Sequence, residues 1–223
     1  MLYRLTKSKF ILGLQCEKAL YLDIYKPQLA YHSPETLCRF RMGRDFEAKI
    51  KSQFDNGIDI SQILRGSIQK YPELTSQYLS EEGEKTLFEA GFVYNEVLVL
   101  ADVVHKTAKG DVTIYEIKNS TSVKTVFQRD VCIQNYVIDH CIDKLVSFQL
   151  IYNDGNDNPL YHELLPYAKS NMPLIAQQVE RFKAVIQGLE PDIVMGEQCL
   201  YPYECPFSRY CKGMVSTQTE LAL

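Results

Sequence analysis

The sequence predicts an α/β protein, and three features of the chain indicate this class. Two β-branched runs within residues 96–119 are separated by a turn rich in lysine and glycine, which is typical of a β-hairpin. Amphipathic stretches with helical spacing lie before and after this hairpin. Of the 223 residues, 46% are hydrophobic, so the chain can bury a substantial core. We therefore expect a mixed central sheet flanked by helices.

The part of the chain before the hairpin is expected to be helical. Residues 8–22 carry apolar side chains at helical spacing and predict one helix, with Cys16 toward its middle or end. Residues 33–54 predict a longer helix, because Ser33 suits the N-cap and Pro34 suits the first helical position.

The other elements follow from the same patterns. Residues 71–90 predict a helix in their second half, after an acidic, solvent-facing middle. Residues 120–141 predict a long helix, and residues 145–154 predict a strand that ends in a turn. A last strand is expected within residues 160–167, followed by an amphipathic helix at residues 172–189.

Charged side chains converge in the predicted hairpin. If its strands pair around a turn near Lys109, cross-strand neighbours have residue numbers that sum to about 218, which sets Asp102 opposite Glu116. Side chains alternate along a strand, so Glu116 and Lys118 point to the same side. Adjacent carboxylates repel unless a cation compensates, which favours a divalent metal with oxygen ligands, and Glu47 could complete the set. The same triplet also occurs on solvated surface hairpins, and its spacing leaves that alternative open.

Composition bears on the binding partners and the cellular compartment of the protein. A net charge of -4 gives no simple signature of a nucleic-acid binder, although a local basic groove can exist within an acidic total. The sequence contains neither a long apolar run nor the apolar core of a signal peptide, so we expect a cytoplasmic protein with no membrane partner. In that reducing compartment the seven cysteines are not expected to form a disulfide framework.

Three evenly spaced cysteines lie near the end of the sequence. Cys199, Cys205 and Cys211 are separated by five residues each, in a loop-like stretch that contains two prolines. Buried free thiols explain such a stretch poorly, so we expect the cysteines to ligate a metal or a cluster, and four thiolates suit either zinc or iron–sulfur. Three further cysteines fall on apolar helical patterns and are expected in the core: Cys38, Cys132 and Cys141.

These motifs, taken together, resemble one family of nucleases. Asp102 followed by Glu-Ile-Lys at residues 116–118 resembles the PD-(D/E)xK motif. In the preceding helix, Gly43-x-x-x-Glu47 is similar to the first motif of the RecB-like branch of that superfamily. The helix after the lysine carries a glutamine and a tyrosine, as in that branch, although the tyrosine follows two rather than four residues later.

The cysteines extend the resemblance. One cysteine near the N-terminus and three near the C-terminus, the last two in Cys-Pro-Phe-x-x-x-Cys, are similar to the iron–sulfur members of this branch. These include CRISPR-associated RecB-like exonucleases and AddB-type helicase–nucleases. The gap between Cys199 and Cys205 is wider than the two residues typical of the CRISPR-associated group. The resemblance favours a [4Fe-4S] cluster over zinc, and Cys16 would then be its fourth ligand.

The resemblance implies a restriction-endonuclease-like core in a single domain spanning residues 1–223. Its core would cover about residues 30–190, and a cluster would join about residues 5–25 to 192–213. The implied activity is hydrolysis of phosphodiester bonds in DNA, as an exonuclease on single strands, with Mg²⁺ or Mn²⁺ as cofactor. DNA-processing or CRISPR-adaptation proteins are the implied partners.

The resemblance also assigns roles to residues. The implied ligands of Mg²⁺ or Mn²⁺ are Glu47, Asp102, Glu116 and the carbonyl of Ile117. The implied catalytic residues are Asp102, Glu116, Lys118 and Gln134, and the implied cluster ligands are Cys16, Cys199, Cys205 and Cys211. The candidates for substrate binding are Lys124, Arg129 and Tyr136. Two other functions stay open: a DNA-binding or assembly module that keeps the fold without activity, and a binding protein stabilised by zinc.

Overall fold

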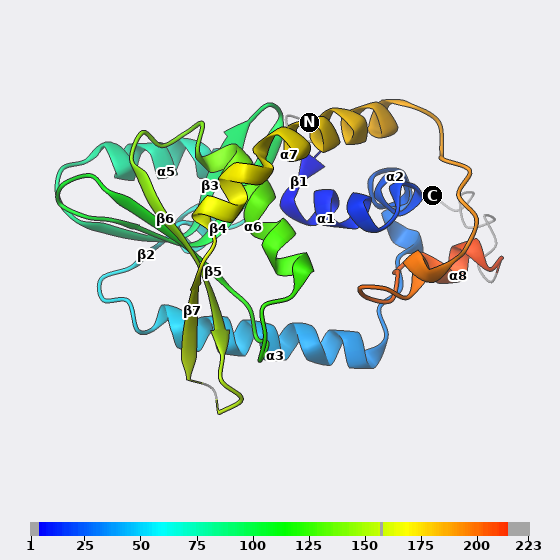
Figure 1. Cartoon of the computed structure of the whole chain (residues 1–223), viewed down its shortest axis with the longest axis horizontal. Helices are drawn as coiled ribbons and strands as arrows, with labels where there is room; N and C mark the ends of the chain where they lie inside the picture. Colours follow the sequence, from blue (N-terminus) through cyan, green and yellow to red (C-terminus); the bar gives the residue numbers. More distant parts are fainter. Residues whose placement is uncertain (1–4, 157, 214–223) are drawn as a thin grey trace.

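The computed structural model describes residues 5–156 and 158–213, and one mixed sheet forms its centre (Figure 1). Its strands lie in the order β2-β3-β4-β5-β6-β7, with β1 paired to β4. The strands are β1 Leu5–Thr6, β2 Ile58–Asp59, β3 Lys85–Tyr94, β4 Val97–Lys106, β5 Val112–Ile117, β6 Leu145–Asn153 and β7 Pro159–Glu163. The α-helices are α1 Lys7–Gln15, α2 Glu17–Tyr25, α3 Pro34–Lys51, α4 Ile60–Leu64, α5 Tyr71–Ser80, α6 Thr125–Ile138, α7 Leu165–Gln187 and α8 Ser208–Cys211. Short 3-10 turns span Pro27–Leu29, Ile68–Lys70 and Glu197–Cys199.

Strand directions confirm a mixed α/β sheet. The β3–β4, β4–β5 and β6–β7 pairs are antiparallel, whereas β5 and β6 are parallel and are connected by α6. A parallel pair needs such a crossover, which explains why a helix follows β5 directly. In the β4–β5 hairpin Val103 pairs with Tyr115 and Val104 pairs with Ile114, so the predicted sum of 218 is confirmed.

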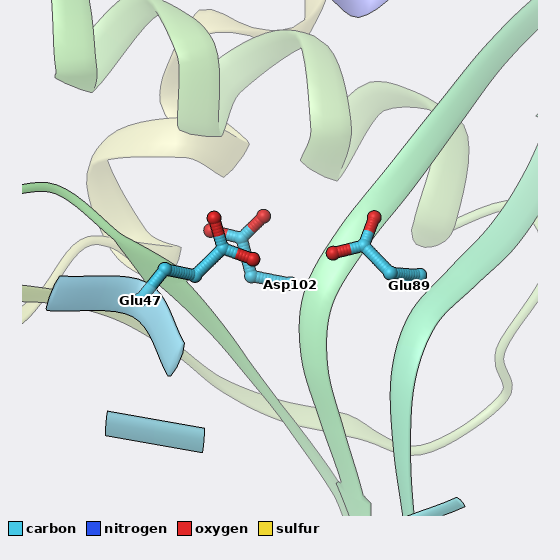
Figure 2. Close-up of side chains that lie close together, drawn as sticks. All are labelled: Glu47, Glu89 and Asp102. Carbon is cyan, nitrogen blue, oxygen red and sulfur yellow. The ribbon is translucent and has the colours of Figure 1, made fainter. Parts of the chain in front are cut away.

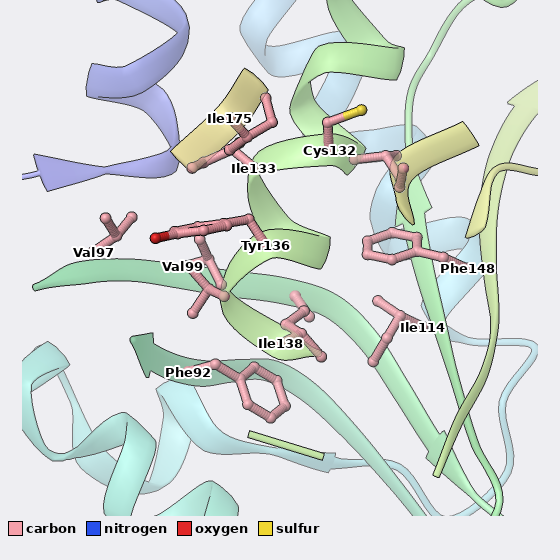
Figure 3. Close-up of a cluster of buried hydrophobic side chains, with 14 of the residues drawn as sticks. Phe92, Val97, Val99, Ile114, Cys132, Ile133, Tyr136, Ile138, Phe148 and Ile175 are labelled. Carbon is pink, nitrogen blue, oxygen red and sulfur yellow. The ribbon is translucent and has the colours of Figure 1, made fainter. Parts of the chain in front are cut away.

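Helices cover both faces of the sheet. Val104 belongs to the larger core beneath α6, α7 and α1, where Ile114 and Ile133 also meet (Figure 3). Its neighbour Val103 points the other way and joins a smaller cluster with Phe46 of α3. Alternation along one strand therefore fills two cores, and β4 lies between α3 on one face and α6 on the other.

The prediction of one helix at residues 8–22 is wrong, because the chain breaks at Cys16. This residue has φ of -162° and ψ of 119°, an extended conformation that ends α1 and starts α2. The helix at residues 33–54 is confirmed as α3, with Ser33 at its N-cap accepting a hydrogen bond from the Thr36 N–H.

The prediction for residues 71–90 is also wrong, since the first half is the helix α5 and the second half is the strand β3. The stretch 85–90 has good helix formers, but β3 pairs with β4 along nearly its whole length. Tertiary pairing overrides local propensity here. The long helix after β7 begins earlier than expected, at Leu165, and contains Pro173. Among the described helices, none is both long enough and apolar enough to cross a membrane.

Candidate active site

Two acidic residues face each other where the ladder between β3 and β4 is interrupted. Position 88 pairs with 103 and position 90 with 101, which leaves Glu89 opposite Asp102 without a regular pair. Glu89 has φ of 53°, in the left-handed region that a non-glycine residue rarely adopts. The Oδ2 atom of Asp102 accepts a hydrogen bond of 2.7 Å from the Ile117 N–H. Strained backbone of this kind gathers at functional sites, and here it brings two carboxylates together.

Glu47 of α3 adds a third carboxylate to these two. Figure 2 shows the three side chains approaching from α3, β3 and β4, and one oxygen of each lies within 4.8 Å of the others. Lys51 lies one turn further along α3, and its Nζ atom is 2.6 Å from Oε1 of Glu47 and 2.5 Å from Oε1 of Glu89. We call Glu47, Glu89 and Asp102 the carboxylate site.

The acidic groups of the carboxylate site lie close together and are partly shielded from solvent. Burial, and then the charge of Glu116, raises the pKa of Asp102 to about 8. Burial likewise raises the pKa of Glu89, although Lys51 opposes the shift. A carboxyl with a pKa of about 8 is mostly protonated at neutral pH, and a bound cation would favour its ionised form.

A ring of four charges lies next to the carboxylate site. Glu116 contacts the Nζ atoms of Lys7 at 2.9 Å and of Lys118 at 2.5 Å. Asp130 of α6 contacts Lys118 at 2.7 Å and lies 4.0 Å from Lys7, which closes the ring. The two acids and two lysines come from α1, α6 and the end of β5, so three distant segments meet here.

Glu116 is the best-satisfied member of the ring. Its side chain is fully buried, and Gln134 donates a hydrogen bond of 2.6 Å to its Oε2. Burial alone would raise the pKa of Glu116, but Lys118 and Lys7 hold it well below its usual range. Burial would lower the pKa values of the two lysines, but the acids around them raise both above the ordinary value. Glu116, Lys7 and Lys118 therefore carry charge at neutral pH. Burial raises the pKa of Asp130, although Lys118 and Lys7 oppose the shift.

The structure does not gather the predicted site residues into a single cluster. Glu47 and Asp102 meet, whereas Glu116, Lys118 and Gln134 belong to the adjoining ring. Ile117 joins the two through its N–H. Two residues of this region, Glu89 and Asp130, were not foreseen from the sequence, and neither was the contact between Lys7 and Glu116. The only signal for Glu89 was an acidic residue in an otherwise apolar stretch.

The residues predicted to bind substrate fall into two groups. Lys124 and Arg129 are exposed near the start of α6, close in sequence to the ring. Tyr136 is only 5% exposed, and its hydroxyl accepts a hydrogen bond from Asn95. Its ring packs against Tyr94, so Tyr136 belongs to the core and cannot stack on a base.

Four cysteines from the two ends of the chain surround one small cavity. Cys16, Cys199, Cys205 and Cys211 all line it, and Phe207 closes it as a fully buried side chain. Gln15 donates hydrogen bonds to the carbonyls of residues 198 and 203, which ties α1 to the C-terminal loop. We call this unit, residues 5–25 and 192–213, the cysteine clasp.

The cysteine thiols of the clasp are partly buried and lie close enough to affect one another. Burial raises the pKa of Cys205 to about 11, and the three neighbouring cysteines add to this shift. Burial also raises the pKa of Cys211. Four thiols around one cavity are a donor set for zinc or an iron–sulfur cluster, which would bind them with release of their protons.

Of the other three cysteines, one lies in the core as predicted and two do not. Cys132 lies in the core, as expected, with 1% of its surface exposed. Cys38 and Cys141 are exposed, so their assignment to the core is wrong. Cys38 lies on a part of α3 that covers no core, and Cys141 follows the end of α6.

Comparison with known proteins adds little to this description. No family model matches the chain, and no curated protein matches it. One solved structure, described as "Crystal structure of SSO0001", is 14% identical, with a TM-score of 0.49. The match covers 95% of this chain and 87% of the other. A TM-score below 0.5 supports no conclusion about fold or function.

Proposed function

We propose that the protein is a metal-dependent nuclease that hydrolyses phosphodiester bonds in DNA, with a restriction-endonuclease-like core of the RecB-like type. One observation carries the proposal: Glu47, Glu89 and Asp102 bring carboxylate oxygens within 4.8 Å of one another, beside the ammonium group of Lys51. Three converging carboxylates are a donor set for Mg²⁺ or Mn²⁺. A cation held there would activate water and stabilise charge on the phosphate oxygens.

Lys118 would act on the substrate phosphate or on the attacking water. Its ammonium group has three protons, and the ring supplies two acceptors, Glu116 and Asp130. About a quarter of its side chain, 24%, is exposed, so the remaining proton can reach a ligand. Glu116 would thus orient the lysine, and Gln134 would orient Glu116.

The cysteine clasp would hold a [4Fe-4S] cluster that stabilises the domain. Zinc sites favour pairs of cysteines separated by two to four residues, whereas both gaps among Cys199, Cys205 and Cys211 are five residues. These gaps, together with the family resemblance, favour a [4Fe-4S] cluster over a single zinc ion.

Cleavage of labelled single-stranded DNA in the presence of Mn²⁺ tests the activity. We expect Asp102→Asn and Lys118→Met to reduce the rate at least a hundredfold, because each removes a group that acts on the metal or the phosphate. Asp154→Asn, an exposed acid in the β6–β7 turn, is the matched control and should keep full activity. Unchanged cleavage in both site variants would refute the proposal. DNA binding without cleavage in the wild type would instead indicate a non-catalytic module.

Anaerobic purification with metal analysis tests the cluster. A brown protein with broad visible absorption and bound iron is expected, and Cys205→Ser should lose the colour. Cys132→Ser, at a buried cysteine far from the clasp in sequence, should keep it. A colourless protein with one zinc per chain would contradict the assignment.

A further inference from the structure

Lys51 reaches two acids of the carboxylate site at once, although these acids come from different elements. Glu47 lies one turn away on the same helix, α3, whereas Glu89 belongs to β3 and is 38 positions further along the chain. The Nζ atom of Lys51 donates a hydrogen bond of 2.6 Å to Glu47 and one of 2.5 Å to Glu89. The ammonium group therefore bridges two of the three carboxylates of the site.

The surroundings of Lys51 differ from those of an ordinary ion pair on a helix surface. Its side chain is 14% exposed, and its Nζ atom lies 5.8 Å from the centre of the Phe88 ring in β3. Burial would lower the pKa of Lys51, but the charges of Glu89 and Glu47 raise it above the ordinary value. The group thus remains a cation, and it is shielded from the solvent that weakens exposed pairs.

Lys51 leaves oxygen atoms of the carboxylate site for another cation. A carboxylate has two oxygens, and the ammonium contacts one oxygen of Glu47 and one of Glu89. Asp102 is held differently, because its Oδ2 accepts a hydrogen bond from the backbone N–H of Ile117. Figure 2 shows the Glu89 carboxyl group pointing toward those of Glu47 and Asp102. A divalent ion among the three acids would therefore share Glu47 and Glu89 with Lys51.

The charges of this region match one divalent ion. With its acids ionised, the carboxylate site carries three negative charges, and the ammonium of Lys51 reduces this charge to minus two. The adjoining ring of two acids and two lysines adds no net charge when all four groups are ionised. One Mg²⁺ or Mn²⁺ neutralises such a site, whereas a second ion would leave an excess of positive charge in a shielded place, which is costly.

The bridging position of Lys51 is also the position that a second ion takes in other enzymes. Sites with two divalent ions place them about 3.5–4 Å apart, where they stabilise the attacking and the leaving oxygen together. A lysine ammonium is a compact point charge with three donors, so it neutralises carboxylate oxygens as a small cation does. Unlike a divalent ion, it is tied to the chain and needs no uptake from solution.

We propose that the ammonium group of Lys51 takes the place of a second cation in the carboxylate site, so that the protein binds a single divalent ion there. The inference rests on the proposed nuclease function and specifies how many ions take part in it. Lys51 is a positioning residue in this account. It holds Glu47 and Glu89 next to each other, and the one divalent ion acts on water and phosphate.

Electron paramagnetic resonance of bound Mn²⁺, with the anaerobically purified full chain, tests the number of ions. The wild type should bind one ion per chain, and Asp102→Asn should bind it at least tenfold more weakly. Lys51→Ala should bind two ions, and their spins should couple because the ions lie about 4 Å apart. Lys51→Arg keeps a cation and should bind one. Lys85→Ala, which removes a lysine paired with Glu81 at 2.7 Å, is the matched control and should also bind one.

Two results would overturn the proposal. The first is a wild type that binds two coupled Mn²⁺ ions, or none, and this measurement depends on no variant. The second is a Lys51→Ala variant that folds, as shown by circular dichroism, and still binds a single ion. Either result would leave Lys51 as a structural partner of its two acids and nothing more.

Cleavage of single-stranded DNA by the same preparations separates this inference from the proposed function. If the wild type binds one ion and Lys51→Ala binds two, but neither cleaves DNA, the role of Lys51 stands and the nuclease assignment fails. If a wild type that holds two coupled ions cleaves DNA, the nuclease assignment stands and the role of Lys51 is refuted.

Discussion

Replacing Lys7 with methionine should destabilise the protein far more than an ordinary lysine substitution. Lys7 lies at the first position of α1, and its Nζ donates to both oxygens of Glu116, at 2.9 and 3.1 Å. The Glu116 side chain is fully buried, and the Lys7 side chain is 20% exposed. Removing the lysine leaves two acids and a single lysine in the ring.

The expected loss follows from this geometry. Breaking a buried ion pair on one side costs about 3–5 kcal/mol. Lys118 still contacts both acids and Lys7 is partly exposed, so we expect the lower end, about 3 kcal/mol. With a urea slope of about 3 kcal/mol per molar, the unfolding midpoint should fall by about 1 M.

Urea unfolding, with metal content matched between preparations, measures this loss. Urea is uncharged and does not screen the ring. Lys9→Met is the control on the same helix: its pair with Asp23 is 3.8 Å long and partly exposed, so its loss should stay within about 1 kcal/mol. In the double variant Lys7→Met/Glu116→Gln, the loss should be at least about 1 kcal/mol smaller than the sum of the single losses. Equal losses for Lys7→Met and Lys9→Met, or strict additivity, would refute this reasoning.

Three further predictions concern other parts of the molecule. In the folded protein the pKa of Asp102 is about 8, above its ordinary value of 3.8, so the metal-free protein should lose stability as the pH rises from about 4 to 8. The melting temperature measured against pH checks this, and a flat profile, or the same slope in Asp102→Asn, would contradict it. Gly91→Ala should cost about 1–3 kcal/mol in urea, because its Cβ would lie 2.6 Å from the Tyr71 Cβ, whereas Gly43→Ala should be neutral or stabilising. Phe207→Ala should cost about 3–5 kcal/mol and release clasp-bound metal, measured by unfolding and metal analysis; retained metal would contradict it.

Much of the local structure could be predicted because it depends on neighbouring residues. Ser33 and Pro34 start α3, and the turn near Lys109 sets the hairpin register, since caps and turns act over a few positions. The break at Cys16 was missed because the apolar spacing continues through it. The strand β3 was missed because its partner β4, and not its own composition, makes it a strand.

The sequence by itself determined the α/β class, the register of the β4–β5 hairpin as far as the pair of Val103 with Tyr115, and the division of cysteines between the two ends of the chain. Only the tertiary structure decided which charges meet. Lys7 and Glu116 are 109 positions apart, and Lys51 and Glu89 are 38 apart. Contacts at such separations arise from the packing of α1, α3 and α6 around the sheet, because local periodicity fixes the face on which a side chain lies but not the segment that packs against it.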